Sequence, residues 1–186
     1  MTLIDLGGDG GEPLDLADLK SWCRIERSDE DTLLTELIRS ARETVEAETG
    51  LVLMPRSFRV SLDAAPFDGW CRLPRRPLRS VTSVIAYDAG GNARLFGTAD
   101  YRLTRNGDAA AIRMGRSVLA AASNGLEIEF EAGFAEGAAP ASLILAMKRI
   151  AATAYELRSA VAPEQQPAVI PAAARELLAP FRPVRL

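Results

Sequence analysis

The chain has 186 residues, of which 48% are hydrophobic and 25% charged, and its net charge is −3. This composition is typical of a soluble globular protein with one substantial core, and a pI near 5.2 without aromatic residues among the arginines disfavours nucleic-acid readout. The sequence contains no histidine, which excludes the commonest general base and the usual zinc ligand.

The hydrophobic runs indicate neither a secretory signal nor a membrane span. Met1–Pro13 has no basic region followed by an apolar one, so it is not a secretory signal. Its glycine-rich stretch, Gly7–Gly11, lacks the Gly-Lys-Ser/Thr ending of a phosphate-binding loop, so we expect a flexible N-terminal arm. The longest apolar run, at about 138–147, is shorter than the roughly 18 residues of a membrane span. Cys23 and Cys71 are isolated, which favours small core residues in a reducing compartment over a disulfide or a metal site.

Two helices are predicted before residue 51. Asp15 is a suitable N-cap for a short helix at Leu16–Cys23. Ser28 and Asp31 resemble a capping box that opens a long helix over about 29–49, and Gly50 occupies the C′ position. The long helix has an apolar stripe at helical spacing, formed by Leu33, Leu34, Leu37, Ile38, Ala41 and Val45.

Alternating patterns then predict a β-rich region. Asp88–Asn92 and Asn106–Asp108 are the predicted turns of two hairpins. Glu127, Glu129 and Glu131 alternate with apolar residues, which indicates the solvent face of a strand rather than a catalytic carboxylate pair. The predicted strands cover about 58–62, 81–87, 93–96, 101–104, 110–114 and 126–131.

A second long helix is predicted from Pro140, at the N1 position, to about Ser159, and we expect it to pack against the first one. Its predicted inward residues are Leu143, Ile144, Met147, Ile150, Ala151 and Ala154. The predicted class is α+β: a helical core of two long helices and a short N-terminal helix, a β-hairpin-rich central insertion and an extended C-terminal tail. The expected organisation is an arm at 1–13, a domain at 14–160 with helices at 15–50 and 140–160 around a β insertion at 56–131, and a tail at 161–186.

The C-terminal tail combines stiffness with apolar anchors. It holds five of the eleven prolines, so only a short helix at about 172–179 is expected. It also carries apolar side chains that disordered tails lack, such as Val169, Leu178 and Phe181. Two interpretations remain open: the tail docks into another protein, or it folds back over its own domain.

Charge is unevenly distributed along the chain. Residues 1–50 contain 13 acidic and 5 basic residues, whereas residues 51–186 carry a net charge of +5. Part of the positive charge is concentrated in an arginine loop formed by Arg72, Arg75, Arg76 and Arg79. The loop is either simply solvated, or it meets the acidic region of a neighbouring copy in a head-to-tail contact.

No group of residues in the sequence indicates catalysis. Two alternative functions stay open: a small cytosolic binding module, or a carboxylate-dependent hydrolase that uses Asp100 or Asp108 on hairpin loops.

Several segments, in this order and spacing, resemble the head–tail connector proteins (head-completion adaptors) of long-tailed phages and gene transfer agents. The resemblance extends from about Leu14 to Leu186, and only the arm at 1–13 has no counterpart in it. The segments that carry it are Leu14–Lys20, Ser28–Asp31, Glu48–Gly50, Leu73–Val81, Tyr87–Asp88, Phe130–Phe134, Pro140 and Leu177–Arg182.

The resemblance implies a structural role without catalytic residues, metal or cofactor. Such proteins form a ring, commonly of twelve subunits, beneath the portal in the particle neck, after assembly in the bacterial cytoplasm. They extend the DNA channel and offer a platform to stopper or tail proteins. The implied portal-binding residues are Pro180, Phe181, Arg182, Pro183, Val184, Arg185 and Leu186.

Within such a ring, the charge distribution makes the acidic helix and the arginine loop candidates for contacts between subunits. The candidates are Glu30, Glu36 and Glu43 together with Arg72, Arg75, Arg76 and Arg79. We expect DNA to pass through the channel without specific binding, with the acidic helix, including Asp29, nearer the lumen than the arginine loop.

Overall fold

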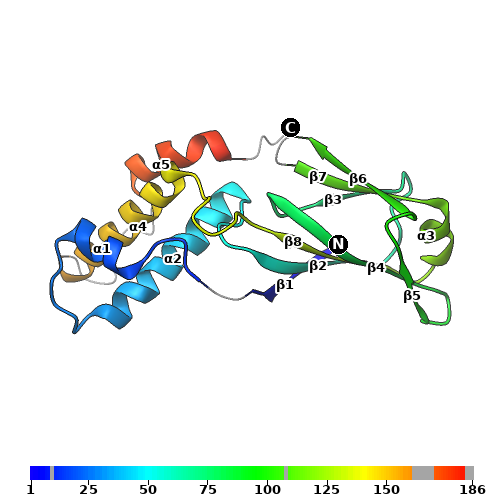
Figure 1. Cartoon of the computed structure of the whole chain (residues 1–186), viewed down its shortest axis with the longest axis horizontal. Coiled ribbons are helices and arrows are strands. Elements are labelled where there is room, and N and C mark those ends of the chain that lie inside the picture. Colours follow the sequence, from blue (N-terminus) through cyan, green and yellow to red (C-terminus); the bar gives the residue numbers. More distant parts are fainter. Residues whose placement is uncertain (9–10, 107–108, 161–169, 183–186) are drawn as a thin grey trace. The chain divides into compact units, whose positions relative to one another are not determined.

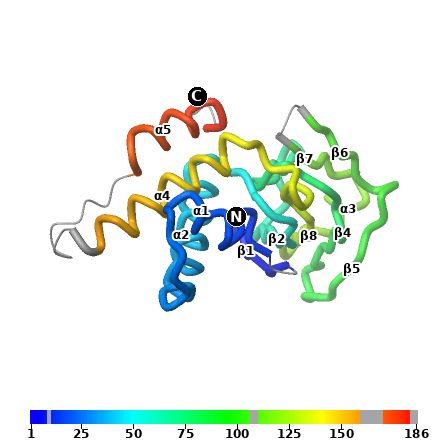
Figure 2. The backbone as a smooth tube through the Cα atoms, turned by 60° about the vertical axis from the view of Figure 1, so that its left-hand side comes forward, coloured from blue at the N-terminus to red at the C-terminus, as the bar shows by residue number. Residues whose placement is uncertain are grey.

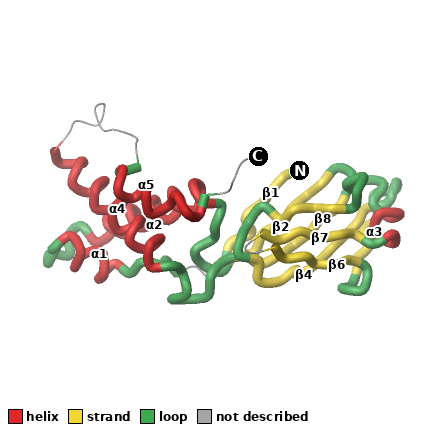
Figure 3. The backbone as a smooth tube through the Cα atoms, turned by 90° about the horizontal axis from the view of Figure 1, so that it is seen from above, coloured by secondary structure: helices red, strands yellow, loops and turns green. Residues whose placement is uncertain are grey.

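The computed structural model describes residues 1–8, 11–106, 109–160 and 170–182 (Figure 1). The chain divides into two compact units, which we call the β unit and the helical unit. The β unit comprises Met1–Gly10 and Pro55–Phe134, and the helical unit comprises Gly11–Met54 and Ala135–Leu186. Figure 3 shows the strands in yellow and the helices in red, including the one short helix that belongs to the β unit. The predicted α+β class is confirmed.

The helical unit is built around two long helices. α2 (Asp31–Thr49) packs along α4 (Ala141–Ala160), as predicted, and α1 (Leu16–Cys23) contacts both. The short α5 (Ala172–Leu178) lies along α4 and continues into the 3-10 turn η2 (Ala179–Phe181) (Figure 2). The core of this unit includes Leu19, Leu34, Ile38, Val45, Leu143, Met147 and Leu178.

The start of α2 differs from the prediction. The helix begins at Asp31, after Glu30 in the N-cap position, and no side chain caps it. The predicted capping box is therefore wrong, because the Asp31 carboxylate instead accepts a hydrogen bond from Lys20 Nζ at 2.6 Å. At the other end Gly50 has φ +68°, the left-handed conformation that a helix-ending glycine adopts readily, so this prediction is confirmed.

The start and inner face of α4 are close to the prediction. The Pro140 carbonyl accepts hydrogen bonds from the amides of Leu143 and Ile144, so the proline precedes the first helical residue by one position. Ala154 is exposed, which corrects its predicted inward position, whereas Ala146 is fully buried. The error is small in energy, because an exposed alanine leaves little apolar surface in water.

The β unit contains two antiparallel sheets. The first has five strands in the order β1 (Thr2–Gly7), β2 (Arg56–Leu62), β8 (Leu126–Ala132), β4 (Leu78–Tyr87) and β5 (Ala93–Phe96). The second has three strands in the order β3 (Trp70–Leu73), β7 (Ala109–Met114) and β6 (Tyr101–Asn106). The short α3 (Arg116–Ala121) follows β7.

Side-chain alternation on the central strand β8 gives the five-stranded sheet two different faces. On the inner face Phe130 is opposite Phe58 of β2, and their stacked rings are 5.7 Å apart between centroids. On the outer face Glu127, Glu129 and Glu131 are half-buried, which confirms that they do not belong to the apolar core. The buried inner residues include Phe58, Val60, Val84, Leu126, Ile128 and Phe130.

Three elements of the β unit are absent from the prediction. Thr2–Gly7, expected within a flexible arm, forms β1, which pairs with β2 at the edge of the sheet. β3 and α3 are only four and six residues long, too short for a periodic pattern to reveal them. The remaining strands follow the predicted alternation with shifts of a few residues at their ends.

Candidate interaction surfaces

The four residues of the arginine loop lie in different environments. Arg72 on β3 and Arg79 on β4 are exposed. Arg75 is half-buried, with its guanidinium carbon 5.9 Å from the centroid of the Phe58 ring. Arg76 is also half-buried. The structure therefore leaves Arg72 and Arg79 best placed to meet another molecule, whereas Arg75 packs on the core of its own unit.

The acidic candidates lie in the helical unit and also differ from one another. Glu36 is exposed, and Glu43 is exposed but paired with Arg39 at 3.2 Å on the next turn of α2. Glu30 accepts hydrogen bonds from the Tyr155 hydroxyl at 2.6 Å and from Arg158 Nη2 at 2.5 Å. Because these donors belong to α4, Glu30 links the start of α2 to the second long helix.

Three groups surround the Glu30 carboxylate, since Arg27 also donates to it. The hydrogen bond from Tyr155, followed by that from Arg158, lowers the pKa of Glu30 from about 4.5 to about 2. Sequence reasoning missed this cluster, because Glu30 and Tyr155 are 125 positions apart in the chain. Glu30 is thus already engaged within its own subunit.

This low pKa predicts a specific acid sensitivity. The charged form of Glu30 contributes stability above the ordinary pKa of about 4.5, and that contribution is lost as the pH falls toward about 2. The difference in unfolding free energy between the wild type and Glu30→Gln should therefore be constant near neutral pH and shrink between pH 4.5 and 2. Urea unfolding across this range measures it. Tyr155→Phe should raise the pKa of Glu30, which an NMR titration of the carboxyl carbon would detect; an unchanged titration would contradict the assigned cause.

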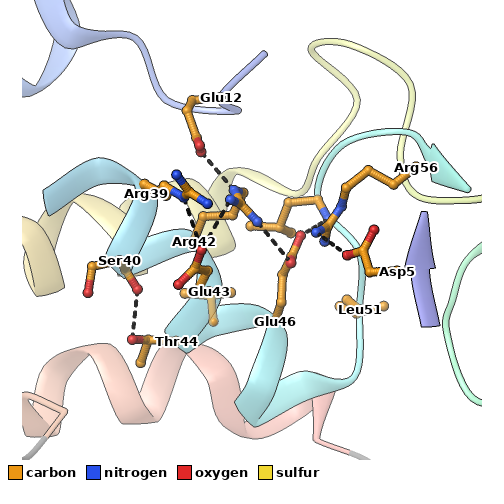
Figure 4. Close-up of polar contacts among 12 residues, drawn as sticks. Asp5, Glu12, Arg39, Ser40, Arg42, Glu43, Thr44, Glu46, Leu51 and Arg56 are labelled. Carbon is orange, nitrogen blue, oxygen red and sulfur yellow. Dashed lines mark hydrogen bonds and ion pairs between the residues drawn. The ribbon is translucent and has the colours of Figure 1, made fainter. Parts of the chain in front are cut away.

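A second ionic cluster connects the loops at either end of the α1–α2 segment (Figure 4). The buried Arg42 donates from Nε to Glu12 at 2.8 Å and from Nη1 to Glu46 at 3.2 Å. Glu46 also accepts a hydrogen bond from the amide of Leu53 at 2.8 Å. These contacts fix the chain before α1 and after α2, so we interpret the cluster as structural.

The C-terminal segment contributes to the helical unit as far as the structure describes it. Ala174 and Leu178 are fully buried, and Arg182 pairs with Glu48 of α2 at 2.5 Å. This part of the tail therefore folds back over its own unit, one of the two alternatives that the sequence leaves open. Of the predicted portal-binding residues, Pro183, Val184, Arg185 and Leu186 lie outside the described residues.

A positively charged sheet surface, which sequence reasoning missed, lies on the outer side of the three-stranded sheet. Trp70, Arg113 and Arg102 form one row across β3, β7 and β6, and Arg72 lies in the next row. The guanidinium carbon of Arg113 is 5.7 Å from the centroid of the Trp70 ring. The available signal was the alternation of Arg102 and Arg113 with the apolar residues of their strands. We call Trp70, Arg72, Arg102 and Arg113 the cationic face.

The candidate residues for catalysis or metal binding that the structure describes are engaged in local hydrogen bonds or at least partly buried. The Asp100 carboxylate accepts hydrogen bonds from the Ser117 hydroxyl at 2.7 Å and the Gly97 amide at 3.2 Å, and Asp108 lies outside the described residues. Burial raises the thiol pKa of both Cys23 and Cys71. Among the described residues we find no cluster of three metal-ligating side chains, and no helix long and apolar enough to cross a bilayer.

Comparisons with known proteins place these surfaces in context. Residues 13–88 match the family described as phage gp6-like head–tail connector proteins. A chain in the neck of an empty gene transfer agent particle, computed with C6 symmetry, is 27% identical; the match covers 100% of this chain and 97% of that one, with a TM-score of 0.81.

Two further solved structures resemble the whole chain equally well. A chain in the virion of a native gene transfer agent particle is 26% identical with a TM-score of 0.80, and a chain in a native neck computed with C12 symmetry is 25% identical with a TM-score of 0.78. Each match covers 100% of this chain and 97% of the other chain. No curated protein matches the sequence.

Proposed function

We propose that the chain is a structural subunit of the neck of a phage or gene transfer agent particle, because residues 13–88 match the phage gp6-like head–tail connector family and the whole chain resembles chains of gene transfer agent necks. In this role it joins the head to the tail and is not an enzyme. The observation that carries the proposal is the similarity of the whole chain, both units included, to chains of gene transfer agent necks. The proposed partners are the portal on the head side and a stopper or other connector on the tail side.

The proposed assembly is a ring, for which we favour twelve subunits because a similar neck was computed with C12 symmetry. The ring would extend the channel through which DNA passes without specific binding. Contacts around a ring are heterologous, so each subunit needs two different complementary surfaces. The proposed charged contacts join the exposed Arg72 and Arg79 of one subunit to the exposed Glu36 and Glu43 of its neighbour. Glu30, Arg75 and Arg76 are half-buried and would act on this contact only through their charge.

The end of the tail is the proposed portal-binding element. Pro180 and Arg182 are exposed and Phe181 half-buried at the end of a segment that α5 anchors to α4. An anchored segment of this kind would direct Pro183–Leu186 toward a partner at a smaller cost in conformational entropy than a wholly free tail. The proposed element therefore comprises residues 180–186.

Removing Pro183–Leu186 tests this function. The deletion leaves every contact described above in place, so the thermal unfolding of the purified protein should be unchanged. Loss of a central anchor costs an interface about 2 kcal/mol or more, so the affinity for the portal ring should fall by more than about tenfold. Surface plasmon resonance against the portal measures the affinity, and electron microscopy counts tailed particles from a producer strain that carries only the truncated gene.

Arg175→Ala is the matched control. Arg175 is exposed on α5, outside residues 180–186, and its only side-chain hydrogen bond among the described residues is the one that Nη2 donates to the Ile170 carbonyl at 3.3 Å. The substitution keeps the whole proposed element, so its portal affinity should stay close to that of the wild type. Tailed particles in normal number from a strain that lacks the gene altogether would show that the chain is not a neck component.

A further inference from the structure

The cationic face carries an energetic cost that the fold of the subunit does not explain. Arg102 and Arg113 are exposed and directly opposite each other on neighbouring strands. Like charges in this position destabilise a sheet. In the part of the chain that the structure describes, no carboxylate forms an ion pair with Arg72, Arg102 or Arg113. An anionic partner outside the subunit would remove this cost.

The groove beside the cationic face adds further positive charge to this end of the sheet. It is lined by Arg102, Arg113 and Arg116, together with Asp100. The Asp100 carboxylate is already occupied by the Ser117 hydroxyl and the Gly97 amide. The guanidinium groups therefore dominate this end of the sheet.

The outer side of the five-stranded sheet has the opposite character. Glu127, Glu129 and Glu131 alternate along β8, so all three carboxylates project from one side of a single strand. Arg59 of β2 pairs with Glu129 at 2.5 Å, and the hydroxyl of Ser80 contacts Glu131 at 3.2 Å. Three carboxylates and one guanidinium leave this surface negative. We call Arg59, Glu127, Glu129 and Glu131 the acidic face.

We propose that the cationic face of one subunit docks on the acidic face of a neighbouring copy. The inference rests on the proposed function, because a ring needs heterologous contacts, and it names a pair of surfaces for one of them. Guanidinium groups bind carboxylates through paired hydrogen bonds. The cationic face offers three arginines, and the acidic face offers three glutamates, of which Glu127 and Glu129 share the single guanidinium of Arg59. Each face then neutralises charge that its own subunit leaves uncompensated.

The cationic face suits a protein better than it suits nucleic acid. Base recognition on a sheet requires an aromatic ring that is open for stacking, whereas Arg113 lies over the ring of Trp70, which is half-buried. The face also presents only three arginines and no lysine. A complementary surface of the same chain, by contrast, is present at a fixed ratio of one to one.

A charge-swap experiment on the full chain tests the contact. Variant A carries Arg102→Glu and Arg113→Glu, and variant B carries Glu127→Lys and Glu131→Lys. Variant A has two acidic faces and variant B two basic faces, so neither should assemble alone. Their equimolar mixture should assemble again, because A and B can alternate around a ring with an even number of subunits.

Sedimentation velocity measures assembly at concentrations where the wild type forms oligomers, with the portal ring added as a template if the wild type alone is monomeric. The assembly midpoint of each single variant should rise by about tenfold or more, and the mixture should recover most of the loss. The matched control carries Arg94→Glu and Arg175→Glu, two exposed arginines outside both faces, and should assemble like the wild type.

Two outcomes would overturn the proposal. The first is normal assembly of variant A or B alone; the second is a mixture that stays monomeric although circular dichroism shows both variants folded. If variant A assembles normally but loses binding to a duplex DNA probe that the wild type retains, the face binds nucleic acid instead. In each of these cases the wild type still assembles, whereas a wild type that never enters a neck would contradict the proposed function itself.

Discussion

Replacing Phe130 with alanine should lower the free energy of unfolding by about 3–5 kcal/mol, the range typical of a large aromatic residue removed from a core. Phe130 is fully buried on the central strand β8, opposite Phe58 and beside Val81 of β4. Its loss would leave a cavity between the two strands that flank β8, and it would also remove the stacking contact with Phe58. Urea unfolding monitored by circular dichroism measures the change.

Phe67→Ala is the matched control for this substitution. Phe67 lies in the loop between β2 and β3, and its side chain is entirely exposed. The same chemical change should therefore alter stability by no more than about 0.5 kcal/mol. Comparable losses for Phe67→Ala and Phe130→Ala would contradict the assignment of Phe130 to the core.

Leu178→Ala should lower the free energy of unfolding by about 2–5 kcal/mol, although only eight residues follow it in the sequence. Leu178 is fully buried where α5 packs on the long helix α4. A tail that only docked into another protein would tolerate this change without loss of stability. The experiment therefore measures how far the C-terminal segment belongs to the helical unit.

The neighbouring Leu177 provides the comparison for Leu178. It is half-buried on the same short helix, so Leu177→Ala should cost clearly less stability. Thermal unfolding of the two purified variants, followed at 222 nm, gives both values under identical conditions. Equal and small effects would mean that α5 does not contribute to the core in solution.

Long elements with regular periodicity could be predicted from the sequence, because their own residues determine which side is apolar. The stripe from Leu34 to Val45 predicted α2, and the alternation of Leu126–Glu131 predicted β8 and its polar side. Strand β1 was missed because an edge strand depends on its neighbour, and the glycines that follow it are typical of a loop. The order of the strands in the two sheets depends on contacts between distant segments, which local patterns do not report.

The candidate surfaces were predictable only where charge is concentrated along the sequence. Four arginines within eight positions indicated the arginine loop, although the packing of Arg75 on Phe58 could not be foreseen. The cationic face brings Arg72, Arg102 and Arg113 together from three strands, and each of these residues is unremarkable in its own segment. Similarly, Glu30 has an ordinary acidic context until α4 supplies Tyr155 and Arg158.

The division of the chain into units also determines the order in which they can form during synthesis. The helical unit is interrupted by the whole of Pro55–Phe134, so the synthesis of α2 ends about ninety residues before that of its partner α4 begins. At bacterial rates of up to about 20 residues per second, Leu34, Ile38 and Val45 stay uncovered for roughly 5 seconds or longer. The β unit meanwhile has all of its strands, including β1 from the very start of the chain, once Ala132 has been added. A nascent chain would thus hold a complete β unit before α4 is available to cover α1 and α2.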